Sequence, residues 1–360
     1  MGIVFVTQTL DAEHPALAQT LDLVTALAAR TDELAVLCAA VGDHEALPPN
    51  VRVRSFAAPT RMARGLRFSR MLGAELRRRP RPDAVLAHMV PLFVLLAAPL
   101  AKPLGVRLAL WYTHWHAGTT LRLATRLADV VLSVDRRSFP LASPKVRGIG
   151  HAIDVDRFVP APARDDGGGP LRLLALGRTA RWKGYDTMLA GLERALARGL
   201  DAELEIRGPQ LTADERAHRA ELAAAVAASP MLSRRVRIEP PLPRSELPDV
   251  LARADALLSA TQPHGSDTLD KVVFEAAACA VPVIASNVAL ADFLGGLALE
   301  LRFAPRSVDE LSDRLLAVAA AGAAARGAVG AELRRRVVAG HSVEAWADAV
   351  VAAVAGGAPQ

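Results

Sequence analysis

The sequence predicts an α/β fold made of two doubly wound domains, each a parallel sheet covered by helices on both faces. With 360 residues the chain is long for one domain, and two domains of about 150–180 residues are the usual solution at this length. Short apolar runs alternate with helical patterns along almost the whole chain, which is typical of parallel sheets. The alternation stops at the Pro- and Gly-rich stretch 160–170 and restarts at residue 171. We therefore expect two similar domains with a cleft between them.

Each expected strand is a short run of aliphatic or β-branched residues that ends at polar, Gly or Pro residues. The expected strands are residues 3–7, 34–38, 51–56, 83–87, 106–111, 129–134, 171–176, 202–207, 235–239, 254–259 and 281–285. Apolar residues at helical spacing separate these runs. The expected helices are residues 15–30, the basic segment from 61, then 92–101, 120–128, 185–198, 213–228, 244–252, a helix opened by Asp270, 308–320, 328–338 and 342–354. Pro15 stands in the first turn of its helix, where proline is tolerated.

Composition bounds the class of protein. Hydrophobic residues make up 51% of the chain and aromatic residues only 4%, so the cores must be aliphatic. Cys38 and Cys279 show no metal-ligand spacing, which is typical of a protein from a reducing compartment. The chain starts directly with an apolar strand and lacks a signal-peptide pattern, and the apolar stretch 91–101 is too short to span a bilayer. We expect a soluble, cytoplasmic protein.

The net charge of +5 is unevenly distributed, and one segment is strongly basic. Its arginines are Arg61, Arg64, Arg67, Arg70, Arg77, Arg78, Arg79 and Arg81, with Glu75 as the one acid among them. Apolar residues interleave at helical spacing, and such a helix can lie on the anionic inner face of a membrane or receive an anionic acceptor. A solvated arginine face is the alternative. Nucleic acid is not expected as a partner, because the chain lacks a recognised binding motif and has few aromatic residues to stack on bases.

The stretch 261–287 combines a strand end, a polar loop, a helix and a further strand. In open α/β sheets this is the edge where ligands bind. Asp270 is a plausible N-cap, and the helix that follows offers unpaired N–H groups and a positive dipole end to a phosphate. Asp267 and Glu275 bracket that helix end, so one carboxylate can face a sugar while the other reaches a ribose. An ordinary βα loop beside an exposed helical Glu275 is the alternative interpretation.

A second loop follows the first strand of the second domain, with the sequence G-R-T-A-R-W-K-G over residues 177–184. Gly177 permits a sharp turn, and Arg178 and Lys183 stand at the same edge of the sheet as the 261–275 stretch. A guanidinium fork and an ammonium point charge beside a helix N-terminus would form a clamp for a diphosphate. A pair of surface cations is the alternative.

These motifs resemble a known family. The pattern G-R-x4-K-G, followed by D-x7-E and by A-x-x-V-P-V-I-A-S, is similar to the retaining glycosyltransferases of family 4, which have the GT-B fold. The segment Trp111-Tyr-Thr-His114 resembles their histidine-bearing loop, and residues 150–158 resemble their signature at the domain junction. Three features depart from the family pattern. Asp267 stands where Glu is usual, and Asp270 stands where Gly is usual, which places a carboxylate near the expected diphosphate. The first βα loop reads E-H-P-A-L-A over residues 13–18, where the family often has paired glycines.

The resemblance implies roles for individual residues. The cations Arg178 and Lys183 would hold the donor diphosphate, and Glu275 would bind the ribose of the nucleotide. The backbone N–H groups of Leu269, Asp270 and Lys271 would cradle phosphate. The residues next to the reacting carbon would be Asp267, which contacts the transferred sugar, and His114, which faces donor sugar and acceptor. On the acceptor side His14 and His88 are further candidates from the residues alone, and for His88 a capped loop histidine is the alternative.

The resemblance also implies a domain organisation and a reaction. Residues 1–157 would form the acceptor-side domain, onto which the helix 341–356 crosses back, and residues 158–340 would form the donor domain. A sugar would move from a UDP- or GDP-type donor to a hydroxyl of a small-molecule, glycan or lipid-linked acceptor, with retention, without a metal or other cofactor. The alternative is a nucleotide-sugar-binding protein with weakened catalysis; a GT-B phosphorylase or epimerase would need a second-substrate site that the sequence does not show.

Overall fold

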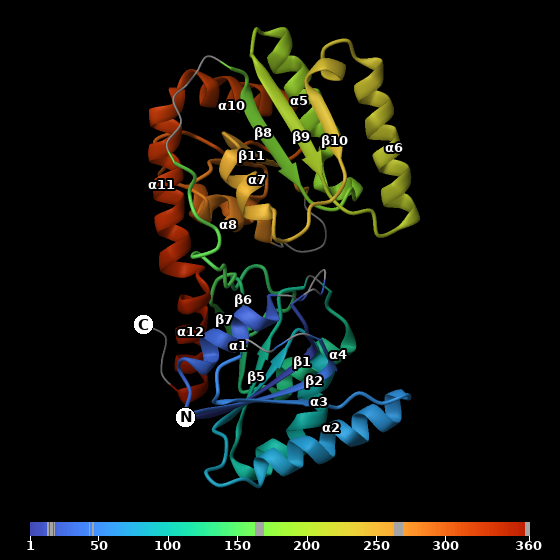
Figure 1. Ribbon diagram of the computed structural model, residues 1–360, viewed down its shortest axis with the longest axis vertical. Helices are drawn as coiled ribbons and strands as arrows, with labels where there is room; N and C mark the ends of the chain where they lie inside the picture. Colours follow the sequence, from blue (N-terminus) through green and yellow to red (C-terminus); the bar gives the residue numbers. More distant parts are fainter. Residues whose placement is uncertain are drawn as a thin grey trace. The chain divides into compact units, whose positions relative to one another are not determined.

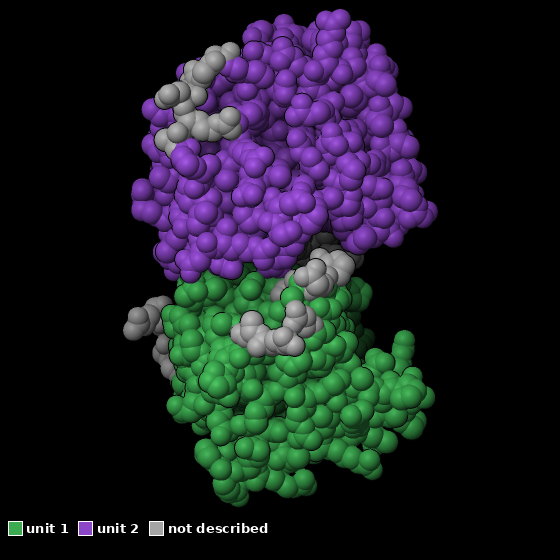
Figure 2. All heavy atoms as spheres, viewed as in Figure 1, with its two compact units in different colours: residues 1–152, 340–360 green, residues 153–339 purple. Residues whose placement is uncertain are grey.

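The computed structural model describes residues 1–12, 14, 17, 19–42, 44, 47–114, 116–162, 169–262 and 269–356. The chain forms two compact units (Figure 2): unit 1 comprises residues 1–152 and 340–360, and unit 2 comprises residues 153–339. Each unit is built around one parallel sheet (Figure 1), so the predicted fold of two doubly wound α/β domains is confirmed.

Unit 1 contains a sheet with the strand order β3-β2-β1-β4-β5-β6-β7. Its strands are β1 (Gly2–Leu10), β2 (Glu33–Val41), β3 (Val51–Ser55), β4 (Ala84–His88), β5 (Arg107–Trp111), β6 (Val130–Ser133) and β7 (Val146–Gly148). Its helices are α1 (Thr20–Ala28), α2 (Arg61–Leu76), α3 (Pro91–Ala101), η1 (Lys102–Leu104), α4 (Thr119–Leu127) and α12 (Val343–Ala355). The short edge strand β7 was not expected from the sequence, because its three residues carry no alternating pattern.

Both faces of this sheet are covered. The helices α2, α3 and α4 pack side by side on one face, over a core in which the rings of Phe56, Phe68 and Phe93 contact one another. On the other face α12 packs against α1 and against the strands β5 and β6. Trp346 of α12 is fully buried and meets Trp111 edge-to-face, with ring centroids 5.8 Å apart. A helix distant in sequence thus completes the core of unit 1.

Unit 2 contains a sheet with the strand order β10-β9-β8-β11-β12. Its strands are β8 (Leu171–Leu176), β9 (Ala202–Arg207), β10 (Val236–Glu239), β11 (Ala256–Ser259) and β12 (Val283–Ala285). Its helices are η2 (Arg181–Lys183), α5 (Tyr185–Ala197), α6 (Ala213–Ala228), η3 (Leu232–Arg234), α7 (Leu247–Arg253), α8 (Lys271–Ala278), η4 (Val288–Leu290), α9 (Ala291–Leu294), α10 (Val308–Ala320) and α11 (Gly322–Gly340). The direction of strand addition reverses between β8 and β11, and ligands of open α/β sheets bind at such a switch point.

Among the described residues no single helix is long and apolar enough to cross a membrane. The helices α10 and α11 pass that test only as a pair bent by 109°. The apolar helix α3 buries Phe93, Val94 and three alanines in the core, as expected for residues 91–101.

Candidate functional site

The two loops singled out in the sequence meet at the switch point of unit 2. The loop after β8 runs through η2 to Gly184, and the N–H of Gln262, beyond β11, donates a 2.8 Å hydrogen bond to the carbonyl of Trp182 in η2. The Lys183 ammonium lies 4.5 Å from the centre of the Trp182 ring. The two loops therefore form one structure at the carboxyl edge of the sheet.

The glycines of the first loop are needed for this approach. Gly184 has a φ of 69°, and a Cβ atom there would lie 2.2 Å from the carbonyl oxygen of Ala260. Gly177 has a φ of 146°, and its carbonyl accepts a 2.7 Å hydrogen bond from the hydroxyl of buried Tyr185. Only glycine adopts these conformations without strain, and at residue 184 only glycine leaves room for the end of β11.

Asp270 precedes α8 at the N-cap, but its side chain makes no capping hydrogen bond. Its carboxylate instead forms an ion pair with Lys183 and accepts a 2.5 Å hydrogen bond from the hydroxyl of Thr261. The side chains of Lys183 and Asp270 are each only 12% exposed. An aspartate at this position usually accepts hydrogen bonds from the first-turn N–H groups. In α8 the carboxylate of Asp270 pairs with Lys183 and makes no such hydrogen bond.

The other two cations of the predicted site are also paired within unit 2. Lys271 forms a 2.8 Å ion pair with Glu275 one helical turn further along α8, and Glu275 is 6% exposed. Arg178 forms a 2.5 Å ion pair with Glu215 of α6, whose side chain is 3% exposed. Lys183 thus lies at the N-terminus of α8 as the sequence predicted, while Arg178 is bound to a carboxylate from another helix.

Glu215 does more than neutralise Arg178. It is the N3 residue of a capping box with Thr212 that begins α6, and it accepts a 2.6 Å hydrogen bond from the N–H of Leu211. Burial alone would raise the pKa of Glu215, but the hydrogen bonds from Leu211 and Arg178 outweigh it and hold the pKa below its usual value. The sequence reasoning missed both Glu215 and Thr261. The T-x-x-E spacing of residues 212–215 is the capping-box signal that could have identified Glu215.

Among the remaining predicted residues of unit 2, Leu269 is buried next to Asp270, directly before α8. Asp267, expected to contact the transferred sugar, lies outside the described residues.

The three predicted histidines belong to unit 1 and differ in environment. His88 ends β4, is buried, and lies 3.0 Å from the Thr7 hydroxyl through Nδ1, with its ring stacked on Phe5. Burial lowers the pKa of His88 to about 4, so the ring is neutral at pH 7. His88 is thus a buried histidine at the carboxyl end of β4, and its acceptor-side role stays a prediction.

His114 follows β5 and is exposed, and its Nδ1 accepts a 3.1 Å hydrogen bond from the N–H of His116. Burial of part of the ring and the neighbouring His116 lower the pKa of His114. His14 accepts a 3.0 Å hydrogen bond from the N–H of Leu17. The ring of His114 is exposed and can exchange a proton with a ligand, which the buried ring of His88 cannot do without local opening.

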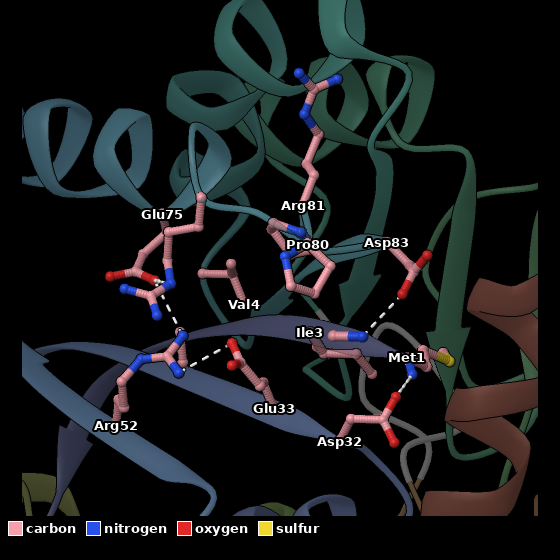
Figure 3. A pocket seen from close by; sticks show the side chains of 14 residues that line it. Met1, Ile3, Val4, Asp32, Glu33, Arg52, Glu75, Pro80, Arg81 and Asp83 are labelled. Atoms are coloured by element: carbon pink, nitrogen blue, oxygen red, sulfur yellow. Dashed lines mark hydrogen bonds and ion pairs between the residues drawn. The ribbon is translucent and has the colours of Figure 1, made fainter.

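A cavity of about 150 Å³ opens in unit 1 at the opposite, amino-terminal edge of the sheet (Figure 3). Several of its charged groups are paired with one another: Arg52 contacts Glu33 at 3.0 Å and Glu75 at 3.4 Å. The backbone N–H of Gly2 donates to Asp83. Parallel sheets bind ligands at their carboxyl edge, so this cavity lies away from the expected position of an active site. The described residues contain no cluster of three or more His, Cys, Asp or Glu side chains that could hold a metal ion.

Comparisons with known proteins bear on the fold of the chain and on unit 2. Residues 170–321 match the family described as glycosyl transferases group 1. No curated protein matches the sequence. Several solved structures match over nearly the full length but with low identity, so they establish the fold alone. Anabaena Alr3699/HepE, solved with UDP and glucose, is 16% identical with a TM-score of 0.70, covering 98% of this chain and 99% of that chain.

Two further solved structures also match nearly the whole chain at low identity. A glycosyltransferase from Rickettsia africae is 12% identical, with a TM-score of 0.74 and 99% of both chains covered. The sucrose-phosphate synthase of Thermosynechococcus elongatus is 17% identical, with a TM-score of 0.67 and 97% of both chains covered. The chain therefore has the GT-B fold, and its second unit is similar to the glycosyl transferases group 1 over residues 170–321.

Proposed function

From the similarity of unit 2 to the glycosyl transferases group 1 we propose that the protein is a retaining glycosyltransferase of the family 4 type, which transfers a hexose from a nucleoside diphosphate sugar to an acceptor hydroxyl. The observation that carries the proposal is the switch point of unit 2. There the first-turn N–H groups of α8 are not capped by Asp270, and Lys183 lies against the same helix end. A helix N-terminus next to a buried ammonium suits a diphosphate.

In the proposed reaction the bond between the anomeric carbon and the diphosphate oxygen breaks, and the acceptor oxygen bonds to that carbon on the same face. The acceptor proton passes to the leaving phosphate. Negative charge grows on the diphosphate as it leaves, so Lys183, Arg178 and the N–H groups of residues 269–271 would bind the transition state more tightly than the bound donor. Glu275 would bind the ribose, and Asp267 and His114 would contact the transferred sugar. These cations and the α8 dipole would take the place of a metal.

The test is turnover of a panel of UDP- and GDP-sugars with simple glycans and lipid-linked sugars as acceptors, measured by nucleoside diphosphate release. NMR of the product reads its anomeric configuration. Lys183→Met should lower kcat by about 10²–10³, the effect of removing one charge-stabilising donor. Lys102→Met, at an exposed pair with Asp129 in unit 1, is the matched control. Unchanged rates in EDTA support metal independence. An inverted product or normal kcat in Lys183→Met contradicts the proposed mechanism.

A nucleotide-sugar-binding protein with weakened catalysis is the second candidate. It is favoured by the pairing of Arg178, Lys183 and Lys271 with carboxylates of unit 2. Calorimetry separates the two candidates: saturable donor binding with neither transfer nor donor hydrolysis would identify the binding protein.

We also propose that α2 of unit 1 docks on the anionic inner face of a membrane, where a lipid-linked acceptor would be reached. Met62 and Leu66, one turn apart near the start of α2, are 79% and 55% exposed, and this end of the helix extends beyond the sheet of unit 1 (Figure 1). Arginines surround them, while Glu75 is buried and paired with Arg52 and Arg54. Flotation with anionic but not zwitterionic liposomes should recover the protein, and Met62→Ser with Leu66→Ser should abolish recovery. Leu123→Ser, at a residue of α4 that is 42% exposed, is the control.

A further inference from the structure

We propose that Asp270 is a built-in competitor of the donor diphosphate: its carboxylate occupies the place beside Lys183 that a phosphate takes, and so sets how tightly the site holds diphosphate ligands and how fast it releases them. The inference rests on the proposed function and assigns to Asp270 a role in donor affinity and product release.

The side chain of an aspartate at an N-cap usually accepts hydrogen bonds from the first-turn N–H groups. Asp270 has the extended backbone of an N-cap, with φ −72° and ψ 120°, yet its side chain makes no such bond. Both carboxylate oxygens are engaged elsewhere, one by Lys183 and the other by the hydroxyl of Thr261. The carboxylate of Asp270 therefore pairs with Lys183 and does not cap the first-turn N–H groups of α8.

Three of the described cations at this edge of unit 2 are already paired with carboxylates. Lys183 is paired with Asp270, Lys271 with Glu275 and Arg178 with Glu215, so three cations face three carboxylates. Besides these pairs, the positive end of α8 attracts a diphosphate. A phosphate that binds there must replace the Asp270 carboxylate at the Lys183 ammonium.

The three pairs are not equivalent in this respect. Glu215 is fixed by the capping box of α6, and Glu275 is held one turn inside α8, so neither carboxylate stands at the helix end itself. Asp270 stands at that end, next to the N–H groups that a phosphate would use. It is held by one ion pair and one hydroxyl, so it can turn away as the ligand enters. Removing its charge should therefore strengthen binding of pyrophosphate groups specifically.

The experiment compares the full chain with Asp270→Asn by titration calorimetry against UDP, GDP, inorganic pyrophosphate, uridine and guanosine. Asparagine keeps the size of the side chain and a hydrogen bond to Thr261 but leaves Lys183 charged and unpaired. Affinity for UDP or GDP and for pyrophosphate should rise about tenfold, which corresponds to about 1.4 kcal/mol. Affinity for the nucleosides should not change. In turnover assays KM for the donor and the inhibition constant of the released nucleoside diphosphate should both fall.

Asp255→Asn is the matched control, because it makes the same substitution in unit 2 at the opposite edge of the same sheet, where Asp255 pairs with Arg172 at 2.6 Å. It should leave all affinities unchanged. Asp270→Gly is the second variant, for the case in which Asp270→Asn does not fold, and should show the same direction of change.

The outcomes separate the two proposals. If the wild-type chain binds UDP or GDP and both Asp270 variants bind them equally or more weakly, the competitor role is wrong and the proposed function stands. An equal gain for nucleosides and diphosphates also overturns the competitor role, because it indicates a general loosening of the site. If neither wild type nor variants bind any nucleoside diphosphate, both proposals fail.

Discussion

The ion pair between Lys183 and Asp270 should be energetically coupled, and a double-mutant cycle measures this directly. Lys183→Met leaves the Asp270 carboxylate, 12% exposed, with only the Thr261 hydroxyl and the end of α8 to stabilise its charge. Breaking a buried pair costs about 3–5 kcal/mol. The interaction of the Asp270 carboxylate with the α8 dipole offsets about 0.3–1 kcal/mol of this loss. We therefore expect unit 2 to lose about 2–4 kcal/mol of stability in Lys183→Met.

The double variant Lys183→Met with Asp270→Asn contains neither charge, so it should be more stable than the sum of the two single losses predicts. The coupling should be about 2 kcal/mol, within the usual range for residues in contact. Arg194 and Asp309, whose side chains are 56% and 69% exposed, form the control pair, for which the coupling should stay below about 1 kcal/mol.

Differential scanning calorimetry is the assay, because a chain of two units can unfold in two transitions and only that of unit 2 should move. Additive losses at Lys183 and Asp270, or coupling no larger than in the control pair, would refute the description of this contact as a buried, mutually dependent pair.

Three further predictions concern single features. Gly184→Ala should lower the stability of unit 2 by about 2–4 kcal/mol, because its Cβ would lie 2.2 Å from the Ala260 oxygen at a positive φ; Gly199→Ala, with φ 93° and open space around it, should cost only about 1–2 kcal/mol in the same denaturation experiment. The pKa of His88 is about 4 in the folded chain and 6.5 for an unperturbed histidine. The unfolded chain therefore binds the proton first, and the stability of unit 1 should fall as pH drops from about 6.5 to 4. His88→Phe should flatten that dependence in thermal melts, leaving the contribution of His341, whose pKa burial also lowers to about 4. Burial raises the pKa of Cys38 to about 11 and of Cys279 to about 12, so neither thiol should react with a disulfide reagent at pH 8 until denaturant is added, and rapid reaction of the native protein would contradict their burial.

The sequence was a good guide to the fold because the strands of a parallel sheet are short, buried apolar runs. Residues 171–176, for example, were predicted to the residue as β8. The sequence patterns were weaker at the edge of the unit 1 sheet and at the ends of helices. The strand β7 has three residues and no pattern, and α11 extends over Gly322–Gly340 although only 328–338 was expected, because a run of alanines and glycines lacks an apolar stripe.

The candidate site was predicted less completely than the fold. Lys183 lies next to the N-terminus of α8 because the loops after β8 and β11 lie at the same edge of the sheet. The order of the strands in the sequence was enough to predict this. The partner of each cation could not be predicted, since ion pairing depends on which carboxylate the packing brings within reach. Arg178 pairs with Glu215 because the capping box of α6 points that carboxylate inward.

The helix α12 has a consequence for biosynthesis. The sheet of unit 1 is encoded before residue 152, but the face covered by Trp346 stays open until the ribosome has translated all of unit 2. Unit 2 is continuous in sequence and can fold as soon as it has been synthesised. Unit 1 is synthesised earlier, but Trp111 stays uncovered until Trp346 has been added. Nascent-chain stalling before residue 343 should therefore leave unit 1 the more protease-sensitive half.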